Sequence, residues 1–309
     1  MSKKLSPEQK RRMEQHISME ESLLQQLKEA HEKGEYLRFN QPCLKASVIA
    51  EQFYCEKKVE MEHLHGRIET ETKLQGSERH ESLLVDSVEV ERSEILQKIF
   101  SDEPVIVHEM PLLAKYGDVI LAGKPDAIIF KDGAPIVLFE YKFSNSPLPY
   151  KSYHVQARIY GRILEGMGFD TSDLFYTIAV APRASRGDEE LFRKVIKAVN
   201  ENGPNEATLK INDANVYIYE YSQPDAERDI DWALDFWKGS RDAIPSDNPN
   251  KCRNCEYRDK CSRALVHTQN NKIVRKHIMV RLLWLKHSFC TTPSSTATPP
   301  RWQRPSLRD

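Results

Sequence analysis

The sequence predicts an α/β protein in which a mixed β-sheet is flanked by helices. The chain up to about residue 100 carries mostly the apolar spacing of helices. Three β-like segments follow one another between about residues 105 and 143, and beyond them helices and strands alternate. This order of elements is typical of a sheet that is covered by helices.

The bulk composition is that of a polar globular protein. The 309 residues suffice for one large domain or two small ones, with 39% hydrophobic residues and a mean hydropathy of −0.61. The formal net charge of −1 means that a nucleic-acid partner would have to meet a local basic groove. No stretch is long and apolar enough to span a bilayer, and the first residues lack the apolar core of a signal peptide. We therefore expect a cytoplasmic protein with no membrane association.

The helical part begins with residues 5–33, which are rich in Glu, Lys, Gln and Leu and predict a charged helix that is solvated or docks a partner. A second helix is expected to begin near Ser47, whose side chain can cap it. Residues 61–75 are polar and predict an irregular connection, whereas residues 76–100 return to helical spacing.

The sheet is expected to begin with three consecutive strands, Val105–Leu113, Val119–Phe130 and Pro135–Phe143. The segments that follow are helices at 150–168, 186–200 and 224–242, with strands at 174–181 and 213–221.

Residues from about 263 onwards differ in composition, because they hold no Asp or Glu before the final residue. A basic and apolar run, residues 272–287, precedes an end rich in Ser, Thr, Pro and Arg, which predicts disorder. The run fits a helix on DNA or on a membrane surface. An out-of-frame or otherwise foreign extension is an equally good interpretation of the whole tail.

The most informative segment is GKPDAIIFKDGAPIVLFEYKFS, in which Asp126 stands in one predicted strand and Glu140 and Lys142 in the next. We expect a three-residue hairpin loop that ends at Gly133 in the left-handed conformation. In this register Glu140 is the diagonal neighbour of Asp126, and Lys142 shares their sheet face because strand side chains alternate. A two-residue loop would put the two carboxylates on opposite faces.

Two carboxylates that converge on one point repel each other and favour a hard divalent cation such as Mg²⁺ or Mn²⁺. A lysine beside them can orient or deprotonate a water molecule, or stabilise negative charge on a phosphate. Short patterns of this kind are frequent, so a strand with ordinary surface charges is the competing interpretation.

Two further features favour the site. His80, in GSERH, could complete the metal shell, although a lone histidine is more often an ordinary helix residue. Gln156 and Tyr160 are four residues apart on the predicted helix 150–168 and share one face. They could hold a phosphate or stack a base, or they could be plain surface and core residues.

The cysteines form a second constellation. Cys252, Cys255 and Cys261 lie together in CRNCEYRDKC, and neighbouring thiolates of this kind favour a metal. Cys55 is the expected fourth ligand, with Cys43 as the fallback, whereas the sixth cysteine, Cys290, belongs to the tail. Spacing alone fits zinc or an iron–sulfur cluster and favours zinc.

In order, GxxxH, GKPD, EYK and QxxxY resemble the motifs of the RecB-like branch of the PD-(D/E)XK nucleases. With one early cysteine and three late ones in a short chain, the sequence resembles the CRISPR-associated RecB-like exonuclease family, which carries an iron–sulfur cluster. The resemblance implies a catalytic Mg²⁺ or Mn²⁺ held by His80, Asp126, Glu140 and the carbonyl of Tyr141. It also implies a catalytic Lys142 and a role for Gln156 and Tyr160 in DNA binding.

The same resemblance implies a structural [4Fe–4S] cluster on Cys55, Cys252, Cys255 and Cys261, which would close a PD-(D/E)XK core between helical segments. Three regions follow: a charged N-terminal helix at 1–40, the nuclease domain at 41–262 and the basic tail at 263–309.

The implied reaction is hydrolysis of phosphodiester bonds at single-stranded DNA ends, from 5′ to 3′, in CRISPR spacer acquisition and together with other CRISPR adaptation proteins. Two alternatives remain: an inactive, metal-stabilised DNA-binding or adaptor module, and a zinc protein with chance D…ExK strands.

Overall fold

The computed structural model describes residues 5–33, 37–69, 92–144, 146–181, 189–202, 207–211 and 214–266. His80, most of the predicted helix 76–100 and the tail from residue 267 lie outside these ranges. Within them, no helix combines the length and the apolar character needed to cross a membrane.

The centre of the molecule is a six-stranded mixed sheet in the order β2-β5-β6-β7-β9-β8. Its strands are β2 (Val105–His108), β5 (Ala127–Lys131), β6 (Ala134–Phe143), β7 (Phe175–Ala181), β8 (Ala207–Ile211) and β9 (Ala214–Glu220). Strands β6 and β7 pair in parallel, whereas every other neighbouring pair is antiparallel. The prediction of a mixed sheet with flanking helices is confirmed.

The parallel pair needs a crossover connection, and helix α5 (Lys151–Gly166) supplies it. Val155, Ile159 and Ile163 recur every four residues and are fully buried against the sheet. The helix ends where Gly168 takes a φ of 84°, a left-handed conformation that suits glycine. Because α5 directly follows β6, its polar face lies beside the end of the strand that carries Glu140 and Lys142.

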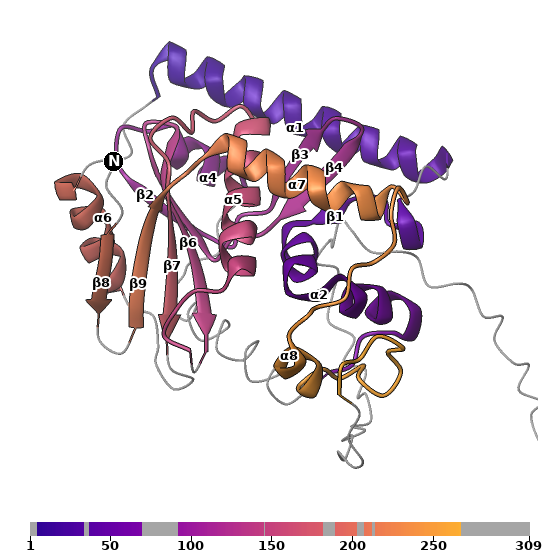
Figure 1. Cartoon of the computed structure of the whole chain (residues 1–309). Helices are drawn as coiled ribbons and strands as arrows, with labels where there is room; N and C mark the ends of the chain where they lie inside the picture. The colour runs from indigo at the N-terminus through magenta and orange to yellow at the C-terminus, as the bar shows by residue number, and fades with distance from the viewer. Residues whose placement is uncertain are drawn as a thin grey trace, which may run out of the picture.

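Helices cover both faces of the sheet (Figure 1). One face packs against α5, with α4 (Arg92–Ile99) beside β2, and α7 (Gln223–Trp237) and α2 (Ala46–His65) pack in turn on α5. The other face packs against α6 (Glu189–Asn202). Strand residues alternate between two buried clusters, with Leu138 on the α5 side and Val137 and Phe139 on the α6 side. Burial of each such side chain stabilises the fold by about 1.5–3 kcal/mol.

A second sheet of three strands has the order β1-β4-β3, with β1 (Leu44–Lys45), β3 (Leu112–Tyr116) and β4 (Val119–Gly123). Two predicted strands, 105–113 and 119–130, are each divided between the two sheets, because the chain breaks in the middle of both. Glu109 has a φ of 48° and Pro111 stands two residues later, so the chain leaves the first sheet here. Pro125 stands at the second break, between β4 and β5. The prediction of three long strands is wrong at both points.

Helix α1 (Pro7–Lys33) packs onto this second sheet rather than standing apart in solvent. Leu23 and Leu27 are buried with Leu113 and Ile120. His16 is also buried, and its Nδ1 lies 2.9 Å from the carbonyl oxygen of residue 167, at the end of α5. The charged helix therefore covers part of the same molecule.

Some elements escaped the sequence patterns. Helix α2 continues to His65, into a segment predicted to be irregular, and strand β8 was not predicted. The short helices η1 (Arg38–Asn40) and α8 (Pro249–Arg253) were also missed. Helix α8 carries the first cysteine of the C-terminal group.

Candidate active site

The hairpin between β5 and β6 determines where the carboxylates lie. Lys131 pairs with Ala134, so the loop contains only Asp132 and Gly133. Both have positive φ, 48° and 75°, as in the type I′ turn that suits the twist of a hairpin. The prediction of a three-residue loop is therefore wrong.

A β-bulge corrects the register that this two-residue loop would impose. Phe130 pairs with Pro135, but Ile129 already pairs with Val137, so Ile136 is an extra residue in β6. Beyond the bulge Ala127 pairs with Phe139, and Asp126 stands one residue before it. The carboxylates of Asp126 and Glu140 consequently belong to the same sheet face, as neighbours across the hairpin rather than on the predicted diagonal.

Asp126, Glu140 and Lys142 are connected by short polar contacts. The Asp126 carboxylate accepts a hydrogen bond from the backbone N–H of Tyr141 at 2.6 Å. Lys142 Nζ donates to Glu140 Oε1 at 2.5 Å, and Glu140 is only 3% exposed. Burial lowers the pKa of Lys142, but the charges of Glu140 and Asp126 outweigh this effect and the net direction is upward. Lys142 is therefore a fixed positive charge between the two strands and α5.

Helix α5 continues the hydrogen-bond chain. Lys142 Nζ also donates to Gln156 Oε1 at 3.0 Å, and Gln156 Nε2 donates to the Tyr160 hydroxyl at 2.8 Å. That hydroxyl donates in turn to the carbonyl oxygen of Lys124 at 3.2 Å. Burial, together with the charge of Glu140, raises the pKa of Tyr160 well above its usual value, so the residue stays a neutral donor. The predicted pair thus connects Lys142 in β6 with the segment just before Asp126.

Gly123 explains the close approach of Tyr160. A Cβ at this position would lie 2.6 Å from the Tyr160 ring, a distance that only glycine avoids. The glycine of the GKPD motif is therefore a packing requirement of the tyrosine of the QxxxY motif.

Three residues that the sequence reasoning did not single out also surround the site. The ring centroid of Tyr153 lies 5.1 Å from Lys142 Nζ, within the range of a cation–π contact. His108 pairs with Ala127, and burial lowers its pKa although Asp126 opposes this effect. The backbone N–H of Glu109 donates to the Asp126 carbonyl at 3.2 Å. The sequence signal that could have identified His108 and Glu109 is the polar pair that they form at the end of an apolar strand.

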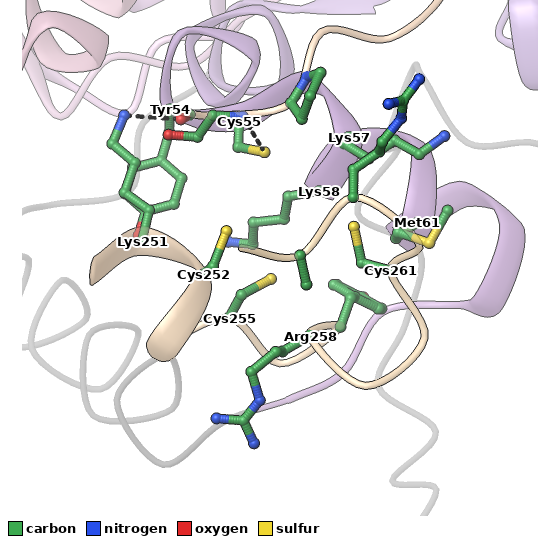
Figure 2. A pocket seen from close by; sticks show the side chains of 15 residues that line it. Tyr54, Cys55, Lys57, Lys58, Met61, Lys251, Cys252, Cys255, Arg258 and Cys261 are labelled. Atoms are coloured by element: carbon green, nitrogen blue, oxygen red, sulfur yellow. Dashed lines mark hydrogen bonds between the residues drawn. The ribbon is translucent and has the colours of Figure 1, made fainter. Parts of the chain in front are cut away.

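The four cysteines predicted to act together line one pocket (Figure 2). Cys55 comes from α2, Cys252 from α8, and Cys255 and Cys261 from the turns that follow α8. The pocket encloses about 410 Å³, part of it open to solvent. Cys43 does not line it and instead lies buried against α1 and the small sheet.

Cys55 interrupts its own helix. Its backbone is extended, with φ −170° and ψ 110°, in the middle of α2. The break exposes its thiol to the C-terminal segment, where the backbone N–H of Ser246 lies 3.4 Å from the Cys55 sulfur. Tyr54, next to it, accepts a hydrogen bond on its carbonyl oxygen from Lys251 Nζ at 2.8 Å. Two segments almost 200 residues apart in the sequence are thereby joined at the pocket.

A buried ion pair fastens the same two segments. Glu56 is 1% exposed and accepts hydrogen bonds from both terminal nitrogens of Arg241. It also accepts from the backbone N–H of Ile244 at 2.9 Å. Tyr257, a buried residue that lines the pocket, donates from its hydroxyl to the Gly66 carbonyl at 2.8 Å. The cysteines are therefore carried by elements that are already connected.

Across the part of the chain that the structure describes, no three or more His, Cys, Asp or Glu side chains are arranged to hold a metal ion. At the hairpin the two carboxylates would need a further ligand, and the predicted one, His80, lies outside the described residues. In the pocket, the Lys58 side chain extends into the space between Cys55 and Cys255 (Figure 2). Burial raises the pKa of the Cys255 thiol, which favours the protonated form over the thiolate that a metal requires.

The chain belongs to the PD-(D/E)XK nuclease superfamily, whose sequence profile matches residues 4–262 and so includes α1. A segment of 54 residues, 18% of this chain, is 35% identical to the mitochondrial exonuclease V of Candida dubliniensis. That segment spans 8% of the relative's length. The solved structure of the protein SSO0001 overlaps 81% of this chain and 98% of its own, with 13% sequence identity and a TM-score of 0.43.

Proposed function

We propose that this protein is a metal-dependent DNA exonuclease that hydrolyses phosphodiester bonds at single-stranded ends, from 5′ to 3′. The observation that carries the proposal is that Asp126, Glu140 and Lys142 share one face of the sheet, which the bulge in the hairpin makes possible. Hydrogen bonds from Lys142 to Gln156 and from Gln156 to Tyr160 continue this polar group onto α5. Membership of a nuclease superfamily and the partial similarity to an exonuclease support it.

The donor set fits a hard divalent cation, because Asp126 and Glu140 present oxygen ligands on one sheet face. The proposed ligands are these two carboxylates, the carbonyl of Tyr141 and His80. A bound Mg²⁺ or Mn²⁺ would supply Lewis-acid chemistry to the phosphodiester and its attacking water.

The proposed role of Lys142 follows from its charge. Its amine stays protonated at neutral pH, because the neighbouring carboxylates hold its pKa above the usual value. In this state Lys142 attracts the phosphate and stabilises the negative charge that develops during hydrolysis. Gln156 holds the amine in place from α5, and Tyr160, which is only 3% exposed, serves DNA binding through the position that it gives Gln156 and Lys142.

We further propose that Cys55, Cys252, Cys255 and Cys261 bind a [4Fe–4S] cluster with a structural role. Support comes from the position of all four around one pocket and from the similarity of the motif order to iron–sulfur nucleases. Soft thiolate donors suit iron–sulfur clusters and zinc alike. The pathway that we propose, a cytoplasmic role in CRISPR spacer acquisition with other adaptation proteins, rests on the resemblance of the sequence alone.

A nuclease assay tests the proposed activity. Anaerobically purified protein is incubated with single-stranded DNA labelled at the 5′ or the 3′ end, with Mn²⁺ or with EDTA, and Lys142→Ala is compared with the wild type. We expect cleavage that requires Mn²⁺ and falls by about 10²–10⁴-fold in the variant. The two label positions give the polarity. If both proteins bind DNA but neither cuts it, the inactive DNA-binding or adaptor module becomes the better interpretation.

Metal content tests the cysteine pocket. Iron, zinc and acid-labile sulfide are measured in the wild type, in Cys252→Ala and in Cys43→Ala. A [4Fe–4S] protein is brown and loses iron in Cys252→Ala, whereas Cys43→Ala, which alters a cysteine outside the pocket, keeps it. A colourless protein that contains one zinc would establish the zinc interpretation instead.

A further inference from the structure

The loop that joins β6 to α5 carries an exposed apolar surface. Among the Phe, Tyr and Trp side chains that the structure describes, Tyr150 alone is exposed, at 49%, and Leu148, two residues earlier, is 63% exposed. Two such side chains within three residues form a small apolar surface that a ligand could cover. The loop begins just after the strand of Lys142 and ends at the helix of Gln156 and Tyr160.

Residues 146–150 of this loop are held in shape by their own contacts and by the sheet. Pro147 and Pro149 flank Leu148 and restrict the backbone on both sides. The Tyr217 hydroxyl, from β9, donates to the carbonyl oxygen of Pro147 at 2.8 Å. Ser146 Oγ lies within 3.4 Å of the Leu148 carbonyl oxygen. Leu148 and Tyr150 are therefore presented in fixed positions, which reduces the entropic cost of binding.

A short series of contacts leads from this surface to the candidate active site. The ring centroids of Tyr150 and Tyr153 are 5.3 Å apart with their planes at 73°, an edge-to-face pair. The Tyr153 ring is the one that contacts Lys142 Nζ at 5.1 Å. Tyr150 is thus one aromatic ring further from the site than Tyr153.

The chemistry of the surface indicates what it binds. Lys151, the first residue of α5, is exposed and follows Tyr150 in the sequence, and its Nζ lies 4.8 Å from the centroid of the Phe53 ring, so an accessible positive charge stands at the end of the same loop. An exposed aromatic ring next to a basic side chain is the combination with which proteins bind unpaired nucleotides, because the base stacks and the cation attracts the phosphate. A base within a duplex cannot stack in this way, since both of its faces are already covered by its neighbours.

We propose that Tyr150, with Leu148 at its side, is a stacking platform for an unpaired base of the DNA strand whose phosphate is at Lys142, and that Lys151 attracts the adjacent phosphate. The proposal rests on the proposed nuclease function, and it assigns the preference for single-stranded DNA to a particular loop. Tyr150 binds substrate here and takes no part in the chemical step.

Binding measurements on the full-length protein test the platform without cleavage. In EDTA, fluorescein-labelled oligo-dT, the same strand made fully abasic, and a blunt duplex are titrated with the wild type, Tyr150→Ala, Tyr150→Phe and Leu64→Ala. Leu64, 57% exposed at the end of α2, is the control for loss of an exposed apolar side chain. Circular dichroism confirms that each variant is folded.

We expect Tyr150→Ala to weaken binding of oligo-dT roughly tenfold, within the range known for loss of one base stack. Tyr150→Phe and Leu64→Ala should bind like the wild type, and Tyr150→Ala should not change the affinity for the abasic strand or the duplex. Equal affinity of Tyr150→Ala and wild type for oligo-dT would overturn the proposal. So would an equal loss on the abasic strand, because no base is available there to stack.

The outcome is separable from that of the nuclease proposal. If the wild type cuts DNA in a Lys142-dependent manner but Tyr150→Ala binds oligo-dT normally, the nuclease function stands and the platform fails. If no preparation cuts DNA but binding of oligo-dT depends on Tyr150, the platform stands on a protein that binds single strands without hydrolysing them.

Discussion

The hairpin of the candidate active site and the cysteine pocket are held in place by different means. Asp126 and Glu140 lie at the ends of sheet strands, where backbone pairing, a bulge and the side chains of α5 fix their positions without a ligand. The four cysteines lie on a broken helix, a five-residue helix and turns, and a few polar contacts connect these elements. The comparison teaches that the candidate active site is preorganised by the fold, whereas the cysteine pocket depends on the ion pair of Glu56 with Arg241, which we call the clamp.

The largest effect is expected from breaking the clamp. Glu56→Ala leaves Arg241 and the Ile244 N–H without their buried acceptor, and loss of one partner of such a buried pair costs about 3–5 kcal/mol. The free energy of unfolding, measured with urea, checks this. Asp118→Ala, which removes an exposed ion pair with Lys238, is the control and should cost less than about 1 kcal/mol. Equal losses in the two variants would show that the clamp does not matter.

A smaller effect is expected on the active-site side. Tyr160→Phe removes one hydroxyl from the chain that runs from Lys142 through Gln156 to Lys124. We expect a loss of about 1–3 kcal/mol in stability, because buried polar partners are left unpaired, and a fall of roughly tenfold in cleavage of single-stranded DNA. Tyr221→Phe is the control, since its hydroxyl contacts only Glu165, at 3.4 Å, among the contacts described. Unchanged cleavage in Tyr160→Phe would mean that Gln156 positions Lys142 unaided.

Acid should weaken the fold through His154, on the same helix α5. Burial, and the charge of Arg158, lower the pKa of His154 from its usual value of 6.5 to about 4. The unfolded chain therefore binds more protons between these values, so stability falls as the pH drops from about 6.5 to about 4. His154→Asn should reduce the slope of stability against pH in that window. The slope should not vanish, because burial also lowers the pKa of His63 and His108. An unchanged slope would contradict the assignment.

The smallest effect is expected at the rim of the candidate active site. Lys124 Nζ lies 2.6 Å from a Glu109 carboxylate oxygen, but both side chains are accessible to water. Exposed pairs contribute about 0–1 kcal/mol, so Lys124→Gln should leave thermal unfolding almost unchanged. A larger loss would show that the pair of Lys124 with Glu109, like the clamp, stabilises the fold.

The fold class and the proposed site residues could be predicted from the sequence because they depend on local patterns. Alternation along β6 separates Glu140 and Lys142 from Val137 and Phe139, and the spacing of Gln156 and Tyr160 gives them one helix face. The breaks in the two long strands could not be predicted so well. They depend on a left-handed Glu109 and on the pairing of β4 with distant β1, which no local pattern reports.

The register of the hairpin between β5 and β6 is a second feature that no local pattern predicts. Both the three-residue loop that was predicted and the two-residue loop with a bulge place Asp126 and Glu140 on one face. The requirement for a shared face could be deduced from chemistry, but the means of meeting it could not. The extra residue, Ile136, leaves no signature in the apolar alternation that a reader of the sequence could recognise.

The bulge has a consequence for the evolution of this hairpin. Ile136 pairs with no residue of β5, so its deletion would remove the bulge and still leave Asp126 opposite Glu140. An insertion of one residue between the bulge and Glu140, without a second bulge to absorb it, would instead turn Glu140 to the other side of the sheet. A single-codon change of this second kind would erase the proposed active site without altering any of its residues.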